Sequence, residues 1–146
     1  TPQDIAFRYN PSDQCLYMKL PSGRELCYQN ARMGVNDKGK DGLIYDGVNQ
    51  VTRQWGATST FGGKLTENAV QAMARDLLAD LMYRLTKLGY RIVAHIHDEV
   101  IVEVPIGTAN DDLSRIIDLM RVAPKWCNGL LPLNADGYVT PYYKKD

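Results

Sequence analysis

The stretch LTENAVQAMARDLLADLMYRLTKLG, residues 65–89, decides the fold class because it is the one long run of the sequence with helical periodicity. Its apolar residues recur at steps of three and four, which is the spacing of one helix face. These residues are Val70, Met73, Leu77, Leu81, Leu85 and Leu88. Glycines flank the run on both sides, and Glu67 suits the positive end of a helix dipole. The pattern predicts one long helix that starts near Leu65 and ends before Gly89.

Before this helix, the sequence favours strands joined by turns. In CLYMKLPSGRELCY (15–28), apolar Leu16, Met18 and Leu20 alternate with other residues up to a Pro-Ser-Gly turn at 21–23, which predicts a hairpin. LIYDGV (43–48) and QWGATSTF (54–61) are interpreted as two further strands. The polar, glycine-rich segment 34–42 is predicted to be a mobile loop.

After the helix, the sequence predicts a strand pair and a second helix. Residues 91–96 and 100–104 are rich in β-branched side chains, and His-Asp-Glu lies between them at 97–99. A helix is expected over 109–122, with Ile116, Leu119 and Met120 inward and Pro124 ending it. Together these elements predict an α+β fold, in which an antiparallel sheet with hairpins packs against one long helix and a shorter C-terminal helix.

Composition limits the protein to one core and few functional classes. The chain has 146 residues, 45% of them apolar, and a formal net charge of zero, so it lacks the basic excess of most duplex-binding proteins. Three cysteines in no metal-binding pattern suit a reducing cytoplasm. No segment is apolar enough for a membrane span or signal peptide. Because the sequence begins with Thr1, we expect it to be part of a longer polypeptide.

The predicted hairpin at 91–104 places its charges at the turn, where they reach solvent. Ile92, Ala94 and Ile96 are expected on one face, with Val93, His95 and His97 on the other. Asp-Gly or Asn-Gly would form a tight turn more easily, since His-Asp-Glu contains no residue that readily adopts a positive φ. One interpretation of this tip is an ordinary hairpin turn that is polar because it is exposed to solvent.

The functional interpretation is that Asp98 and Glu99 form half of a metal site. Carboxylate oxygens are the ligands that Mg²⁺ prefers, and Mg²⁺ typically uses one or two of them. A two-cation site for phosphoryl transfer needs a further carboxylate from a second strand. Asp46 is the nearest candidate in this chain, and its context in LIYDGV is typical of a turn.

A polar stripe runs along the predicted long helix. Lys64, Asn68, Gln71 and Arg75 follow one another at steps of four, three and four. A solvated helix face is the simpler interpretation. The alternative is a duplex contact, in which amides reach minor-groove acceptors and cations reach phosphates without choosing a sequence. Arg24, directly after the 21–23 turn, is a further candidate for DNA contact.

Four ordered segments resemble the C-terminal part of the palm of a family A DNA polymerase, the polymerase I type, in its bacteriophage form. They are LPSGRELCY, FGGKLTENAVQAMARDLLADLMYRL, GYRIVAHIHDEVIVEVP and LPLNADGYVTPYYKKD. HDEV between two apolar strands is the most specific element. The resemblance implies that Asp98 binds the catalytic cations, that Glu99 assists less directly and that His97 lies near the primer terminus. It also implies that Gln71 contacts the primer–template minor groove.

The family's first two motifs have no match in this chain. They supply the second metal-binding aspartate and the nucleotide-binding fingers helix, so upstream palm, fingers and thumb segments are expected to be absent. The resemblance implies a fragment, residues 1–146, of an enzyme of phage DNA replication that works in the cytoplasm of a bacterial host. Its implied partners are primer–template DNA, deoxynucleoside triphosphates and the missing upstream segment, with two Mg²⁺ ions as cofactors and no membrane.

Three hypotheses follow from the sequence. The chain is part of the catalytic palm of a DNA polymerase and is not active alone, or it is a non-catalytic module that binds primer–template duplex. The third hypothesis is a metal-dependent hydrolase that uses His95, His97 and Asp98. Primer extension with and without the missing segment would separate the first two.

Overall fold

Helix α1 (Gly62–Lys87) confirms the predicted long helix, although it begins at Gly62 rather than near Leu65. The computed structural model describes residues 4–36, 39–49, 52–129 and 131–143. The chain divides into two compact units, residues 1–73 and residues 74–146, and the boundary falls inside α1. Each unit has its own buried apolar cluster, so the expectation of a single core was wrong. In the part of the chain that the structure describes, no helix has the length and apolar character needed to cross a membrane.

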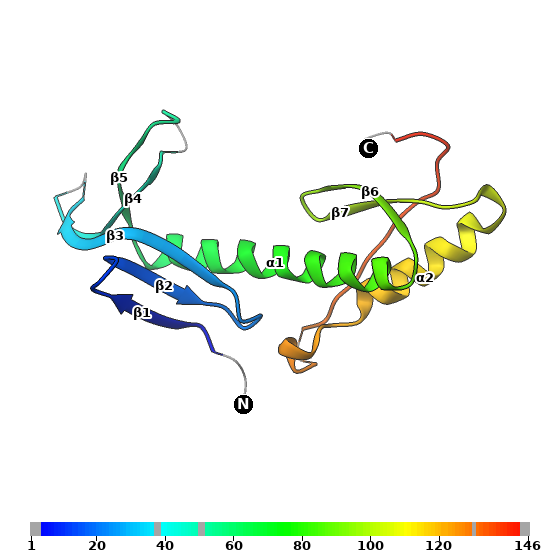
Figure 1. Cartoon of the computed structure of the whole chain (residues 1–146), viewed down its shortest axis with the longest axis horizontal. Coiled ribbons are helices and arrows are strands. Elements are labelled where there is room, and N and C mark those ends of the chain that lie inside the picture. Colours follow the sequence, from blue (N-terminus) through cyan, green and yellow to red (C-terminus); the bar gives the residue numbers. More distant parts are fainter. Residues whose placement is uncertain (1–3, 37–38, 50–51, 130, 144–146) are drawn as a thin grey trace. The chain divides into compact units, whose positions relative to one another are not determined.

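The first unit contains a five-stranded antiparallel sheet with the strand order β1-β2-β3-β4-β5 (Figure 1). Its strands are β1 (Ala6–Asn10), β2 (Cys15–Lys19), β3 (Glu25–Val35), β4 (Asp41–Val48) and β5 (Trp55–Thr60). The predicted hairpin and the two later strands are confirmed as β2–β3 and β4–β5. At the first turn, the Gly23 amide donates to the Leu20 carbonyl at 2.9 Å, and Gly23 has the positive φ of 92° that glycine adopts easily. Together with the helices, this sheet confirms the α+β fold class.

The loop predicted for residues 34–42 is shorter than expected. Gly34 and Val35 continue β3, and Asp41 and Gly42 begin β4, so four of the nine residues pair as strands. Residues 37–38 of this prediction lie outside the described residues. The polar composition of the segment indicated a loop, but backbone pairing between β3 and β4 extends to both of its ends.

The first core lies between this sheet and the first half of α1. Met18 in β2, Leu20 directly after it and Ala69 on the helix are almost fully buried. Tyr28 completes the buried cluster, and its ring meets Tyr45 edge to face with centroids 5.1 Å apart. The alternation predicted in β2 therefore places its apolar residues against the helix.

A bulge in β3 changes the role expected for Asp46. The register of β3 against β4 shifts between Gln29 and Arg32, and Asn30 adopts a φ of 49°. Asp46 accepts hydrogen bonds from Asn30 Nδ2 at 2.8 Å and from Arg32 Nη1 at 3.1 Å. These two contacts lower the pKa of the Asp46 carboxyl. Asp46 lies inside β4 and fixes the bulge, so its assignment to a turn was wrong.

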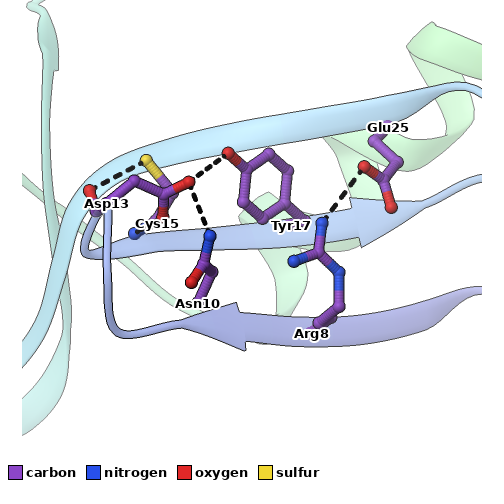
Figure 2. A network of polar contacts seen from close by, with 6 residues as sticks. All are labelled: Arg8, Asn10, Asp13, Cys15, Tyr17 and Glu25. Carbon is purple, nitrogen blue, oxygen red and sulfur yellow. Dashed lines mark hydrogen bonds and ion pairs between the residues drawn. The ribbon is translucent and has the colours of Figure 1, made fainter.

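On the opposite face of the sheet, a polar network ties β1 to β2 (Figure 2). Asp13 accepts hydrogen bonds from the Tyr17 hydroxyl and from Asn10 Nδ2, both at 2.8 Å. Arg8 lies over the Tyr17 ring, 4.4 Å from its centroid, and pairs with Glu25 at 3.5 Å. The sequence prediction did not include β1, whose five residues are too short to show a clear period.

The second unit contains the rest of α1, a β-hairpin and the shorter helix. Its elements are β6 (Arg91–Ile96), β7 (Glu99–Glu103), the 3₁₀ turns η1 (Ile106–Thr108) and η2 (Lys125–Cys127), and α2 (Ala109–Arg121). Leu78, Leu81 and Leu85 of α1 form a buried cluster with Ile116 of α2. The inner side of the hairpin packs on this cluster through Ile92, Val100 and Val102. The prediction of α2 and of its inward residues is confirmed, since Leu119 and Met120 also pack here.

Side chains at both ends of α2 attach it to its surroundings. Arg84 donates to the carbonyls of Leu119 at 2.8 Å and Val122 at 3.1 Å, at the end of the helix where fewer backbone amides are available as donors. At the other end, Asp112 accepts a hydrogen bond from the Tyr90 hydroxyl at 2.9 Å. Tyr90 directly precedes β6, so this contact fixes the base of the hairpin against α2.

The apolar stripe predicted for α1 holds only for the second half of the helix. Val70 in the first half is 55% exposed, whereas its neighbour Ala69 is buried. Leu88, the last residue of the predicted stripe, lies just after the end of α1 and is 62% exposed. The first half instead packs through Leu65, Ala69 and Ala72, because each half serves a different core. Glu67 is also not in the first turn, since α1 begins five residues before it, so the expected role at the helix dipole was wrong.

The second core predicts a large effect of truncation at Leu85. Leu85→Ala should lower the free energy of unfolding by about 2–5 kcal/mol, because a fully buried leucine loses its contacts and leaves a cavity. The matched control Leu88→Ala removes an exposed side chain three residues away and should cost within about 0.5 kcal/mol. Urea unfolding of the chain measures both. Equal losses would contradict the assignment of the core face.

The network around Asp13 predicts a change in acid titration. Its pKa lies below the ordinary value of 3.8, chiefly because the Tyr17 hydroxyl donates to the carboxylate. Tyr17→Phe should therefore raise the pKa of Asp13 toward 3.8, measured by NMR of the carboxyl carbon. A lowered pKa gives stability that is present above 3.8 and lost as the pH falls, so this loss should be smaller in Tyr17→Phe. In the control Tyr9→Phe, the Asp13 titration should stay unchanged; a shift there would point to a general change in the sheet.

Candidate active-site hairpin and nucleic-acid contacts

The hairpin β6–β7 places its acidic residues at the tip, as predicted, but with a tighter turn. His97 and Asp98 form the two-residue connection, and Glu99 is the first residue of β7, opposite Ile96. The expected three-residue tip and the expected start of β7 at Val100 were therefore wrong by one residue. The side chains of His97, Asp98 and Glu99 are all exposed. Both carboxylates are thus accessible to a ligand.

The backbone at His97 is in the left-handed region, with a φ of 52°. The sequence interpretation that no residue of His-Asp-Glu readily adopts a positive φ is wrong for His97, which adopts one. A two-residue hairpin loop needs positive φ at its first position, and His is among the non-glycine residues that tolerate it best. The conformation still costs roughly 1–2 kcal/mol for a residue with a side chain. Strain of this kind is typical of functional sites, so the tip is a site candidate on backbone grounds as well.

A bulge in β6 decides which side chains share a face of the hairpin. The register shifts between Ile92 and Ala94, so Ile92 lies opposite Val102 while His95 lies opposite Val100. Cross-strand partners project to the same face, and Val100 and Val102 both pack on the second core.

His95 pairs with Val100 but is exposed, whereas Ala94 and Ile96 pair with Ile101 and Glu99 on the outer face of the hairpin. Exposure along β6 still alternates as expected, since Ile92, Ala94 and Ile96 are half-buried and Val93 and His95 are exposed, although of the first three Ile92 alone packs on the second core. Arg91 and Glu103, paired at 2.8 Å, mark the base of this outer face.

The donors present fit half of a Mg²⁺ site. Asp98 and Glu99 offer two accessible carboxylates on adjacent residues, which suits a hard cation that keeps much of its water shell. Among the residues that the structure describes, no three His, Cys, Asp or Glu side chains gather to hold a metal ion. The grouping of His95, His97 and Asp98 that a hydrolase would need is therefore not found in this part of the chain. A complete two-cation site requires a carboxylate from elsewhere.

The polar stripe on α1 is not a free row of DNA contacts. Asn68 donates to the hydroxyl of Tyr28 at 3.1 Å, so it is partly engaged with the first core. Lys64 pairs with Glu67 at 3.1 Å, and Gln71 donates to the other carboxylate oxygen of Glu67 at 3.3 Å. Arg75, one turn beyond Gln71, is exposed.

Glu67 is the residue that the sequence interpretation missed at this stripe. It lies three residues after Lys64 and four before Gln71, and this spacing indicates contact on a helix surface. Its negative charge next to the stripe reduces the attraction of Lys64 for phosphates. Arg24, the other predicted DNA contact, donates to the Ala72 carbonyl at 2.8 Å and so joins the β2–β3 turn to α1 within the first unit.

The two candidate regions belong to different units. The hairpin tip lies in the second unit, while Lys64, Asn68 and Gln71 lie in the first. The positions of the stripe residues are set by helix α1, whereas the positions of Asp98 and Glu99 are set by the β6–β7 hairpin. Each region therefore has to be tested by its own measurement.

Comparison with known proteins gives one informative match. No protein-family model matches the chain, and no solved structure matches it. A DNA polymerase of Bacillus phage SP02 is 45% identical to it over 132 residues. The match spans 90% of this chain and 20% of the phage protein. Over most of its length the chain is thus similar to a phage DNA polymerase, of which it spans about a fifth.

Proposed function

We propose that the chain is the part of a family A DNA polymerase palm that contains the third polymerase motif, and that it acts in phage DNA replication together with an upstream polymerase segment. The observation that supports this most is the similarity to the SP02 DNA polymerase along 90% of the chain. The exposed carboxylates of Asp98 and Glu99 at a strained hairpin tip supply the chemistry expected for such a part.

In this proposal, the chain contributes ligands rather than a complete active site. Asp98 and Glu99 would hold Mg²⁺ together with an aspartate from the upstream segment. When bound, the cations would neutralise charge on the phosphate that is transferred. The hairpin itself holds the two carboxylates in place, because its inner face packs on Leu78, Leu81 and Leu85.

The helix stripe would contact the primer–template duplex. The Gln71 amide is exposed and can exchange its contact with Glu67 for a minor-groove acceptor. Lys64 and Arg75 would contact phosphates, and Asn68 would have to share its amide with Tyr28. Such contacts hold a duplex without selecting its sequence.

The test of the proposal is primer extension by the chain mixed with the remaining part of the SP02 polymerase. The chain alone should extend no primer, because it offers carboxylates from one hairpin only. The mixture should extend the primer in the presence of Mg²⁺ and deoxynucleoside triphosphates. A mixture that binds primer–template but never extends it would instead support the non-catalytic duplex-binding module.

Within the extending mixture, the two acids should differ. Asp98→Ala should slow single-turnover incorporation at least about a thousandfold, a barrier increase of roughly 4 kcal/mol. Glu99→Ala should cost clearly less. Asp98 has the shorter side chain and loses less rotamer freedom on fixing an ion, whereas Glu99 already belongs to β7. Duplex affinity is the control and should survive both changes. A larger defect for Glu99→Ala would reverse the assignment.

Gln71→Ala should weaken primer–template binding about two- to tenfold, which corresponds to one hydrogen bond. The factor should be similar on AT-rich and GC-rich duplexes, because the acceptors in the minor groove barely distinguish sequence. Fluorescence anisotropy with labelled duplexes measures both, and Gln54→Ala in the β4–β5 turn is the matched control with no expected effect. If Gln71→Ala weakened binding to one of the two duplexes much more than to the other, this contact would be excluded.

A further inference from the structure

An apolar groove lies between β1 and the first half of α1, within the first unit. Its volume is about 290 Å³, and among the described residues that line it none has a charged side chain. The apolar side chains that line it are Ile5, Phe7, Met18, Leu65 and Ala69. The remaining two lining residues are Gly62 and Thr66. We call this feature the β1–α1 groove.

The strand register explains why the groove is apolar. Phe7 lies opposite Met18, and Met18 is buried against α1, so Phe7 projects to the helix side of the sheet. The helix covers Met18 but leaves Phe7 53% exposed and Ile5 40% exposed. Tyr9, two residues further along the same face, is 51% exposed. Three large apolar side chains in a row thus lack cover on one side of an edge strand.

The exposure is not a sign that β1 is loosely attached. On the other face of the same strand, Arg8 contacts Tyr17 and Glu25, and Asn10 contacts Asp13 (Figure 2). The strand also pairs with β2 over all five of its residues. One face of β1 is therefore fixed by polar contacts while the other presents uncovered apolar surface, which is typical of an interaction site.

We propose that the β1–α1 groove binds an apolar segment of the polymerase polypeptide that lies outside the fifth matched by this chain. The proposal rests on the proposed function. Four fifths of the SP02 polymerase has no counterpart in this chain, so a large polypeptide surface has to meet the palm portion somewhere. Because charge is absent from the groove, the occupant contributes apolar side chains, with Phe7 as the anchor that becomes buried.

The probe for this proposal is the part of the SP02 DNA polymerase outside the 132 matched residues, immobilised through an affinity tag. The unchanged chain should be captured. Phe7→Asp should weaken capture at least tenfold, and Phe7→Ala should weaken it in the same direction with less risk to folding. Met33→Asp, at a 74% exposed position on β3 of the same unit, is the matched control and should bind as the unchanged chain does. Circular dichroism should confirm that all variants fold.

Capture that is absent, or equal for the unchanged chain and both Phe7 variants, would overturn the proposal. The proposal would also be overturned if the chain alone formed a dimer and Phe7→Asp dissociated it, because a second copy of the chain would then occupy the groove. Primer extension by the captured mixture separates this proposal from the proposed function. If the mixture extends the primer but capture does not depend on Phe7, the groove proposal is refuted and the proposed function is not. Phe7-dependent capture without extension supports the groove and counts against the polymerase activity.

Discussion

The packing of the β6–β7 hairpin on the leucines of α1 is the interaction on which the candidate site depends. A hairpin of two strands is marginally stable alone in water, so its geometry has to come from what it packs against. Leu78, Leu81 and Leu85 provide that surface, together with Ile116 of α2. The Tyr90–Asp112 hydrogen bond then fixes the base of the hairpin. The direction in which Asp98 points is therefore set by apolar contacts that lie several residues away from it.

The local chemistry at the tip is compatible with this external support. His97 stays in an unfavourable backbone region, and the bulge in β6 shifts the strand register so that Glu99 pairs with Ile96 on the outer face. Bulges next to active sites often redirect side chains in this way. In the proposed function, the outer face and the tip would be available to an upstream strand, whereas the inner face would serve only stability.

Periodic patterns made much of the fold predictable. The long helix, the β2–β3 and β4–β5 hairpins and α2 each have a repeat of apolar residues long enough to identify, and they were confirmed. The stripe on α1 failed in its first half because two separate cores select different faces of one helix, which a single period does not show. The acids at the hairpin tip were predicted from the contrast between charged and β-branched residues.

Features set by tertiary context were not predictable. The positive φ of His97 and the bulges at Asn30 and Val93 depend on how neighbouring strands align, and no residue there is a glycine. Asp46 looked like a turn residue because its strand partners, which hold it at the bulge, lie far away in sequence. The contacts of Glu67 with Lys64 and Gln71 could have been predicted from their helical spacing, but Glu67 was assigned to the helix dipole instead.

The proposed function requires that the hairpin tip bind a divalent cation as half of a site. Titration of the isotope-labelled chain with Mn²⁺, a paramagnetic substitute for Mg²⁺, tests it directly, because broadening of NMR signals detects even weak binding. We expect selective broadening of the Asp98 and Glu99 amide signals that is lost in Asp98→Ala. Broadening centred on other acids such as Asp13 or Asp112, with the tip unaffected, would contradict it.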